Sequence, residues 1–255
     1  MVNPMRRLID SHVHMESFDE PGAIVQQSAD SGVDAVICVG GNLESSKVVK
    51  RLALEHPGFL YPALGVHPSE ILKEDIDAAV VYLRENLDGC VAVGEIGLDY
   101  AYSFAKPKDI RTRMRGIFSR FLDVASEFDL PASIHSRSAY KDSLELAAGA
   151  GVEGVFHWYD GPIHTLRFIL DAGFYVSATP SVAYSKGAMA VMEETPIDRV
   201  LVETDSPVYL RNLGRRSTPV DVKMVVDALA ELKGMDVSEV SRVTTRNAER
   251  LFRLS

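Results

Sequence analysis

Short apolar runs recur along the chain, separated by longer stretches in which apolar and polar residues follow a helical period. The apolar runs are rich in Val, Ile and Ala and are bounded by turn residues, which predicts β-strands. The predicted strands are Leu8–Asp10, Ala35–Val39, Leu60–Val66, Cys90–Glu95, Ala132–His135, Val155–Trp158, Tyr175–Ala178 and Val200–Glu203. The predicted helices are Glu44–Glu55, Asp75–Glu85, Ile110–Phe128, Ser138–Ala147, His164–Leu170, Ser185–Glu194, Val220–Leu232 and Ser238–Leu251.

The alternation of these elements indicates an α/β fold with parallel strands, because parallel neighbours need long crossover connections. Several strands are apolar throughout, which is typical of strands covered on both faces. Eight such units favour closure into a (β/α)8 barrel, and 255 residues fit one such barrel. No linker-like stretch interrupts the order, so we expect one domain over residues 1–255. The alternative is an open doubly wound sheet, but no GxGxxG motif follows the first strand.

Composition narrows the environment and the partners of the protein. Apolar residues make up 46% and charged residues 25% of the chain, as in ordinary globular proteins. No stretch suits a membrane span, and no apolar run follows the basic N-terminal residues as a secretory signal requires. The two cysteines, Cys38 and Cys90, lie in apolar runs, so we expect free thiols and a cytoplasmic protein. A net charge of −9 argues against stable binding of duplex DNA, which needs many Lys and Arg contacts to phosphate.

Two histidines follow the first predicted strand, in the sequence Asp10-Ser11-His12-Val13-His14. Residues two apart in an extended chain face the same side, so both imidazoles can reach one metal ion. Imidazole nitrogen suits Zn, Fe, Mn and Ni. The alternative is a chance alternation of two loop residues, but the position directly after an apolar strand favours a metal site.

An acidic residue, Glu95, ends the fourth predicted strand, which is otherwise apolar. An unpaired carboxylate there would be costly, and a pair of metal ions would neutralise it. The alternative is a buried salt bridge with an arginine. The glycines flanking Glu95 indicate close backbone approach or a bulge that aims its side chain.

Polar residues also end three further strands. His135 and His157 close the fifth and sixth strands, and Asp205 follows the eighth. A lone histidine at such a place is more often a hydrogen-bonded core residue, but two at equivalent positions on successive strands favour ligands. Asp205 is a candidate both to ligate a metal and to accept a proton from metal-bound water. Glu203 lies two residues earlier and either binds substrate or holds the barrel mouth together.

The third strand is followed by His67, which we place at the barrel mouth as a substrate-binding or proton-transfer residue, or as a structural one. In a barrel all these strand ends converge on the C-terminal face, where active sites lie. We therefore predict a metal site on that face, with Asp205, Glu95 and His67 as its catalytic residues.

The motifs DSHVH, LGVHP, VGEIGLDY, IHSR, GVFHW and ETDSP occur in this order along the chain. In these motifs and their spacing the chain resembles the TatD family of metal-dependent hydrolases, over nearly its whole length. GEIGLDY together with ETDSP is highly specific, whereas HxH is shared by many metallohydrolases. The resemblance implies a TIM barrel of the amidohydrolase type that holds one or two divalent metal ions. The ligands it implies are His12, His14 and Asp205 for the first ion, Glu95 as a bridge, and His135 and His157 for the second.

Members of the family are described as deoxyribonucleases with exonuclease activity, and deacylation of aminoacyl-tRNA is proposed for some. This chain departs from the family at the rim of the site. Where HSRDA and HCFSG are common, it has HSRSA and HWYDG, and the usual basic segment ending RNEP is replaced by RRSTP. These changes leave the implied ligands intact and put the substrate in doubt.

The resulting hypothesis is metal-assisted hydrolysis of a phosphodiester at a nucleic-acid end or in a small molecule, with Mg, Mn or Zn. Asp205 would act as general base, and His67 would protonate or orient the leaving group. Arginine forks suit phosphate oxygens, and the candidates are Arg137 with Arg211 or with Arg215 and Arg216. Aromatic residues that would stack on a base, unless they serve packing alone, are Trp158, Tyr159 and Tyr100.

Two other functions stay open at this point. The same metal ions could hydrolyse an ester or amide, including the aminoacyl ester bond of charged tRNA. A protein of another class, a non-catalytic metal-bound scaffold that binds nucleic acid, would also keep these ligands. In each case we expect a monomer rather than an obligate oligomer.

Overall fold

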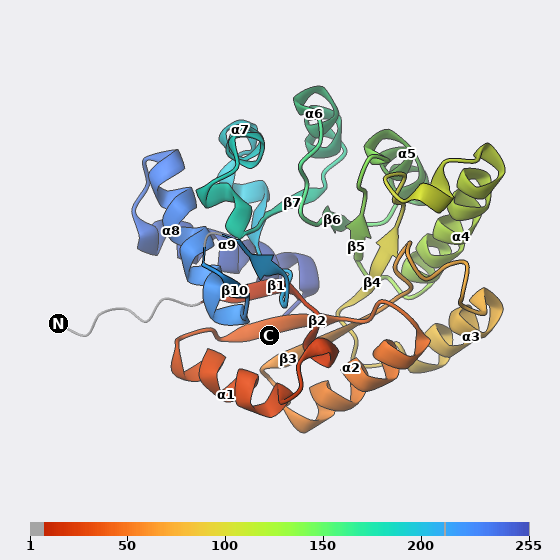
Figure 1. Ribbon diagram of the computed structural model, residues 1–255, viewed down its shortest axis with the longest axis horizontal. Coiled ribbons are helices and arrows are strands. Elements are labelled where there is room, and N and C mark those ends of the chain that lie inside the picture. The colour runs from red at the N-terminus through yellow and green to blue at the C-terminus, as the bar shows by residue number, and fades with distance from the viewer. Residues whose placement is uncertain (1–7, 212, 255) are drawn as a thin grey trace.

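The computed structural model describes residues 8–211 and 213–254, and residues 1–7, where we expect no secretory signal, lie outside this part. In the described part, eight parallel strands form one sheet in the order β1 to β8, which is the predicted barrel (Figure 1). These strands are β1 (Ile9–Val13), β2 (Ala35–Val39), β3 (Leu60–Leu64), β4 (Ala92–Gly97), β5 (Ala132–His135), β6 (Gly154–Phe156), β7 (Tyr175–Ala178) and β8 (Val200–Val202). A separate antiparallel hairpin pairs β9 (Tyr209–Leu210) with β10 (Arg215–Arg216).

Helices surround the sheet on its outer side (Figure 1). Their bounds are α1 (Pro21–Asp30), α2 (Leu43–Glu55), α3 (Ile76–Asn86), α4 (Lys108–Glu127), α5 (Tyr140–Ala150), α6 (Ile163–Asp171), α7 (Lys186–Glu194), α8 (Val222–Lys233) and α9 (Val237–Phe252). Short 3-10 turns are η1 (Met15–Ser17), η2 (Ser103–Ala105), η3 (Pro180–Ala183), η4 (Ile197–Arg199) and η5 (Pro219–Asp221). The predicted helices correspond to α2 through α9, and none of the described helices is long and apolar enough to cross a membrane.

Hydrogen bonds between the first strand and the segment after the last strand close the barrel. The backbone N–H of Thr204 donates to Oδ1 of Asp10 at 3.0 Å. The N–H of Asp205 donates to the carbonyl oxygen of His12, also at 3.0 Å. This closure brings His12 and Asp205 together from opposite ends of the chain.

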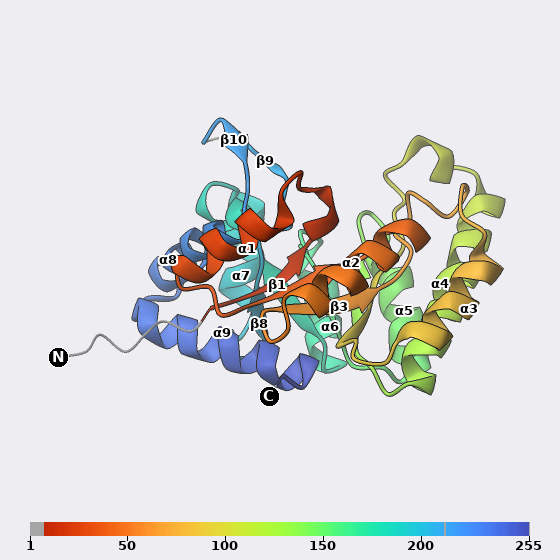
Figure 2. The ribbon, with the colours of Figure 1, turned by 90° about the horizontal axis from the view of Figure 1, so that it is seen from below.

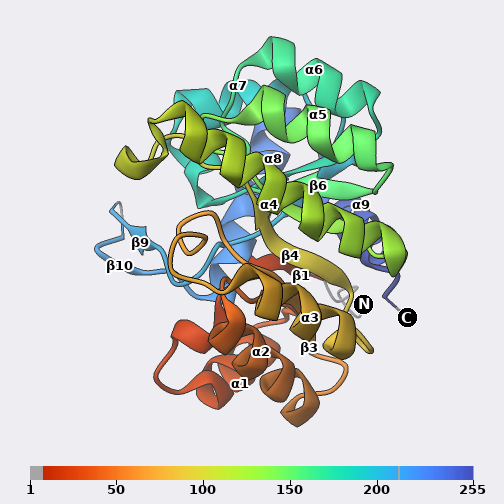
Figure 3. The ribbon, with the colours of Figure 1, turned by 90° about the vertical axis from the view of Figure 1, so that its right-hand side faces the viewer.

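The N-terminal end of the barrel is plugged by α9. Its residues Leu251 and Phe252 belong to one buried cluster with strand residues such as Ile37 and Leu201. Figure 2 shows α9 along one edge of the molecule and the β9–β10 hairpin rising at the opposite edge. Figure 3 shows the same hairpin standing off from the barrel. The C-terminal ends of the strands are therefore the end left open for a site.

The glycines around Glu95 allow β4 to bulge against β5. Val93 pairs with Ala132 and Ile96 with Ile134, so β4 has one residue more than β5 between the two pairs. A Cβ on Gly94 would lie 2.6 Å from the Cβ of Ser133. Such a bulge re-aims side chains and is common next to active sites. The sequence indicated either close backbone approach or a bulge at these glycines, and the structure has both the close approach and the shift of register.

Replacing Gly97 by alanine is expected to destabilise the fold by more than about 1 kcal/mol. Gly97 has a φ of 145°, which only glycine adopts readily, and an added Cβ would lie 2.0 Å from the carbonyl oxygen of His135. Urea unfolding would measure the loss. Gly116 in α4 has nothing within 4 Å of its added Cβ, so Gly116→Ala is the matched control and should stabilise by about 0.5–1 kcal/mol. Equal effects of both substitutions would contradict the prediction.

The structure differs from the sequence prediction at α1, at the β9–β10 hairpin and at the start of α5, among other bounds. The pattern did not predict α1, because its buried side chains are only Val25 and Ser28 and its apolar stripe is too thin to detect. The two-residue strands of the hairpin are likewise too short for a period-two signal. The fourth predicted helix, which is α5, begins at Tyr140 rather than Ser138, because Ser138 has a left-handed φ of 57°.

Candidate metal centre

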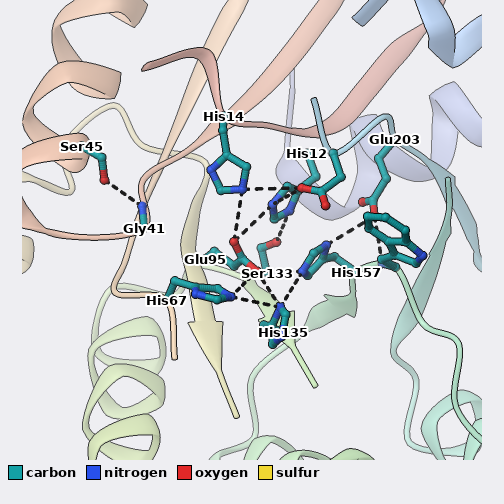
Figure 4. A network of polar contacts seen from close by, with 12 residues as sticks. His12, His14, Gly41, Ser45, His67, Glu95, Ser133, His135, His157 and Glu203 are labelled. Carbon is teal, nitrogen blue, oxygen red and sulfur yellow. Dashed lines mark hydrogen bonds and ion pairs between the residues drawn. The ribbon is translucent and has the colours of Figure 1, made fainter. Parts of the chain in front are cut away.

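The residues predicted as metal ligands all lie together at the open end of the barrel (Figure 4). They come from β1 and the turn after it, from β4 and β5, and from the loops that follow β6 and β8. In that order they are His12, His14, Glu95, His135, His157 and Asp205. The strand ends thus converge as expected, and the pairing of successive strands explains why.

The carboxylate of Glu95 occupies the centre of this cluster, with each oxygen facing a different pair of imidazoles (Figure 4). Its Oε2 lies 3.5 Å from Nε2 of both His12 and His14. Its Oε1 lies 2.9 Å from Nδ1 of His135 and 2.8 Å from Nε2 of His157. Among the described residues, the ion-pair partners of this carboxylate are histidines, and the alternative of a buried salt bridge to an arginine is not observed.

A second carboxylate, Asp205, completes the side that holds His12 and His14. Its Oδ1 lies 3.6 Å and 3.5 Å from the Nε2 atoms of these two histidines. Asp205 has a left-handed φ of 50°, which turns the chain sharply after β8. Aspartate and asparagine tolerate this conformation better than other non-glycine residues.

The donor atoms fit a divalent metal ion. Three overlapping groups have their ligand atoms within 4.8 Å of one another: His12, His14 and Glu95; His12, His157 and Asp205; His67, Glu95 and His135. Within the described residues, Nε2 of His12 is buried and has no hydrogen-bond partner. A buried imidazole nitrogen without a partner is costly, and a metal ion would satisfy it. A mixture of imidazole and carboxylate donors is what Zn, Mn and similar ions accept.

The carboxylates and imidazoles of this cluster shift one another's pKa values toward the charged forms. Burial alone would raise the pKa of Glu95, but the imidazoles of His67, His157 and His12 hold that pKa well below its usual value. Burial would lower the pKa of His157, but the carboxylates of Glu95 and Glu203 raise it well above the usual value. Protons on such imidazoles compete with a metal ion for the same nitrogen atoms.

The cluster also includes His67. Its Nε2 lies 3.3 Å from Nδ1 of His135 and 3.6 Å from Oε1 of Glu95. Burial lowers the pKa of His67 to about 4, so the ring is neutral at neutral pH. Its other nitrogen contacts the Ser69 hydroxyl at 2.7 Å, and that hydroxyl donates to Glu70 at 3.0 Å.

Sequence reasoning missed Asp99, which orients one of the predicted ligands. Asp99 is completely buried, and its Oδ2 accepts hydrogen bonds from Nε2 of His135 at 2.9 Å and Nε of Arg137 at 2.8 Å. The bond to His135 keeps the other ring nitrogen directed at Glu95. Asp99 is also an acid next to an apolar residue, two positions after the end of β4, and this pattern could have revealed it.

Asp99→Asn is expected to weaken Mn²⁺ binding about 10–100-fold, because a carboxylate that holds a metal-ligating histidine in place contributes that much to the affinity. The variant keeps the shape of the side chain but loses the charge that holds His135. Calorimetric titration with Mn²⁺ would measure the affinity. Asp142 accepts a hydrogen bond of 2.7 Å from the Tyr100 hydroxyl and bonds to none of the histidines. Asp142→Asn is therefore the matched control. Unchanged Mn²⁺ affinity in Asp99→Asn would rule out this role.

The predicted substrate-binding residues have different surroundings. Glu203 is fully buried; its Oε1 accepts from the backbone N–H of Trp158 at 2.8 Å and lies 3.4 Å from Nδ1 of His157. Arg137 reaches the cavity above the cluster, and its guanidinium stacks over the ring of Tyr102 at 4.9 Å. Of these two residues, only Arg137 faces the space in which a substrate would lie.

The cavity above the cluster has a volume of about 390 Å³, and its outer wall includes Tyr102, Arg137, Tyr140, Trp158 and Asp160. Trp158 is the one predicted stacking residue on this wall. Tyr159 is 2% exposed and packs against Tyr140, and Tyr100 bonds to Asp142.

The other predicted phosphate-binding arginines belong to the β9–β10 hairpin or the turn within it. Arg211 and Arg216 are exposed there and do not line the cavity. Arg215 instead forms two hydrogen bonds to the carboxylate of Asp221, at 2.8 Å and 2.6 Å. Its fork is therefore occupied by the protein itself.

Comparison with known proteins identifies the family of this site. Residues 9–253 match the family model described as TatD related DNase. The metal-dependent hydrolase YabD of Bacillus subtilis is 31% identical over 260 residues, which cover 97% of this chain and 100% of that protein. The 3'-5' ssDNA/RNA exonuclease TatD of Pectobacterium carotovorum is 29% identical over 91% of this chain and 93% of its own. The crystal structure of YjjV, a TatD homologue of Escherichia coli, has a TM-score of 0.87 and 26% identity, covering 98% of this chain and 99% of that one. The chain therefore belongs to the TatD-related DNase family.

Proposed function

We propose that the protein is a divalent-metal-dependent phosphodiesterase that removes nucleotides from the ends of single-stranded nucleic acid. The observation that carries this proposal is the position of Glu95, whose two oxygens face separate histidine pairs below the cavity. A carboxylate shared in this way suits one or two ions of Mg, Mn or Zn. The names of the relatives YabD and TatD support both the metal and the class of bond.

When bound, the metal would supply a water of lowered pKa and compensate the charge of the phosphoryl oxygens. The chain's own residues would do the rest. Asp205 borders the cavity and would accept the proton of the attacking water. His67 would orient the leaving group, and Arg137 would hold a phosphate oxygen through its guanidinium. Glu203 and Asp99 would position His157 and His135.

The cavity supports a small reacting unit. At about 390 Å³ it lies within the range of small-molecule sites and suits one nucleotide rather than a duplex. The net charge of −9 agrees with a partner held at one end rather than along a double helix. We also propose that the protein acts as a monomer in the cytoplasm, where its two free, buried cysteines would stay reduced.

The test is a substrate panel with Mg²⁺, Mn²⁺ or Zn²⁺ added to the purified protein. We expect release of mononucleotides from single-stranded DNA and hydrolysis of bis(p-nitrophenyl) phosphate. Phosphomonoesters, carboxylic esters, lactones and aminoacyl-tRNA complete the panel. Turnover of esters or aminoacyl-tRNA alone would replace the proposal with the alternative enzyme. Full metal occupancy with tight DNA binding and no turnover would favour a non-catalytic scaffold.

A further inference from the structure

The loop after β6 holds an acidic residue in a fixed place at the cavity wall. The N–H of Trp158 donates to both Glu203 and the Ser177 hydroxyl, each at 2.8 Å. The next residue, Tyr159, is 2% exposed, and its hydroxyl donates to the carbonyl of Pro162 at 2.9 Å. The bonds of Trp158 before Asp160 and of Pro162 after it hold the backbone on both sides, so Asp160 has little freedom to move.

The carboxylate of Asp160 is oriented by Tyr140, whose hydroxyl donates to Oδ1 at 2.6 Å. The Tyr140 ring packs edge-on against Tyr159, with their centroids 5.1 Å apart. A Cβ on Gly161 would lie 2.6 Å from the Tyr159 hydroxyl oxygen and 2.9 Å from the Tyr140 ring, so glycine is required for this packing. Burial and the bond to Asp160 raise the pKa of Tyr140 to about 12, so its hydroxyl keeps the proton it donates.

This arrangement leaves the second oxygen of an exposed carboxylate at the cavity wall. In the described part of the chain no protein donor reaches Oδ2 of Asp160. The same wall has Arg137 as its one Arg or Lys side chain among the described residues, and that guanidinium already donates to Asp99. Because Arg137 would hold the phosphate that is cleaved, a second phosphate on the substrate would meet a negative charge here, with no further Arg or Lys among the described wall residues to offset it.

We propose that Asp160, oriented by Tyr140, accepts a hydrogen bond from a free hydroxyl on the terminal sugar of the substrate. The site then selects nucleic-acid ends without a terminal phosphate. A carboxylate accepts a hydrogen bond from a hydroxyl but repels a phosphate dianion. The same group can therefore recognise a terminal hydroxyl and exclude a terminal phosphate. The inference rests on the proposed phosphodiesterase function and names the end on which that function acts.

Four single-stranded oligonucleotides of one sequence test this, with a free hydroxyl or a phosphate at the 3′ end and likewise at the 5′ end. At the end that is degraded, kcat/KM of the wild type should be at least about tenfold higher for the hydroxyl. Asp160→Asn keeps an acceptor for Tyr140, removes the charge and puts an NH2 donor in place of Oδ2, so it should reduce this preference to about twofold, by faster cleavage of the phosphorylated strand and slower cleavage of the strand with a free hydroxyl. The exposed Asp198 of η4 provides the matched control, Asp198→Asn, which should keep the full preference.

Bis(p-nitrophenyl) phosphate separates this inference from the function on which it rests, because it has no terminal sugar. The control Asp198→Asn should hydrolyse it at the wild-type rate, and Asp160→Asn should still turn it over. If they do, but the wild type treats both ends alike or Asp160→Asn keeps the preference, the role of Asp160 is overturned and the phosphodiesterase stands. If the wild type cleaves no phosphodiester at all, both proposals fall.

Discussion

Replacing Glu95 by glutamine is expected to lower kcat/KM for a phosphodiester by about 10³-fold or more, equivalent to about 4 kcal/mol of transition-state stabilisation. Glutamine has nearly the same shape, so the fold should persist. Its amide nitrogen, however, would take the place of one carboxylate oxygen and present N–H groups to either the His12 and His14 pair or the His135 and His157 pair. One half of the metal centre would lose its shared ligand.

Elemental analysis of the purified variant gives a second readout that does not depend on turnover. We expect fewer bound metal ions per chain than in the wild type, together with an unchanged circular dichroism spectrum. Glu127 pairs with Arg84 on the surface at 2.9 Å, so Glu127→Gln is the matched control and should keep both metal and activity. A Glu95→Gln protein with wild-type turnover would remove the basis of the proposed bridge.

Local signals along the sequence were enough to predict the barrel and the cluster. Period-two spacing brought His12 and His14 to one side of a strand, and an acid ending an apolar run marked Glu95. Both signals depend on a neighbour within a few residues. The parallel order of strands then determines that such ends meet, whatever the helices between them contain.

Other features depend on contacts between distant segments, and the sequence alone did not reveal them. Glu203 was a candidate for substrate binding, but whether its side chain turns toward the cavity or toward the backbone of Trp158 depends on how β6 and β8 lie across β7. The pairing of Tyr140 with Asp160 likewise joins the start of α5 to the loop after β6. No periodicity records such a contact, because each partner looks like an ordinary polar residue in its own segment.

Replacing Asp205 by asparagine is expected to reduce kcat about 10²–10⁴-fold at saturating metal, with a much smaller change in KM. Asparagine still offers an oxygen to the metal and tolerates the left-handed φ of 50°, so the loop after β8 should keep its course. What it lacks is the ability to accept a proton. Alanine would confuse this effect with backbone strain at the same position.

Measuring kcat of Asp205→Asn at increasing metal concentrations shows whether Asp205 acts as a metal ligand or as the proton acceptor. A residue that only helps to hold the metal should regain its kcat when the metal concentration is raised, whereas a missing proton acceptor leaves kcat low at every concentration. Asp129 has almost the same backbone angle, φ 51°, and pairs with Arg253 far from the site, so Asp129→Asn makes the same change without chemical consequence. If metal restores Asp205→Asn to within tenfold of the wild type, Asp205 is a ligand alone and another group must take the proton.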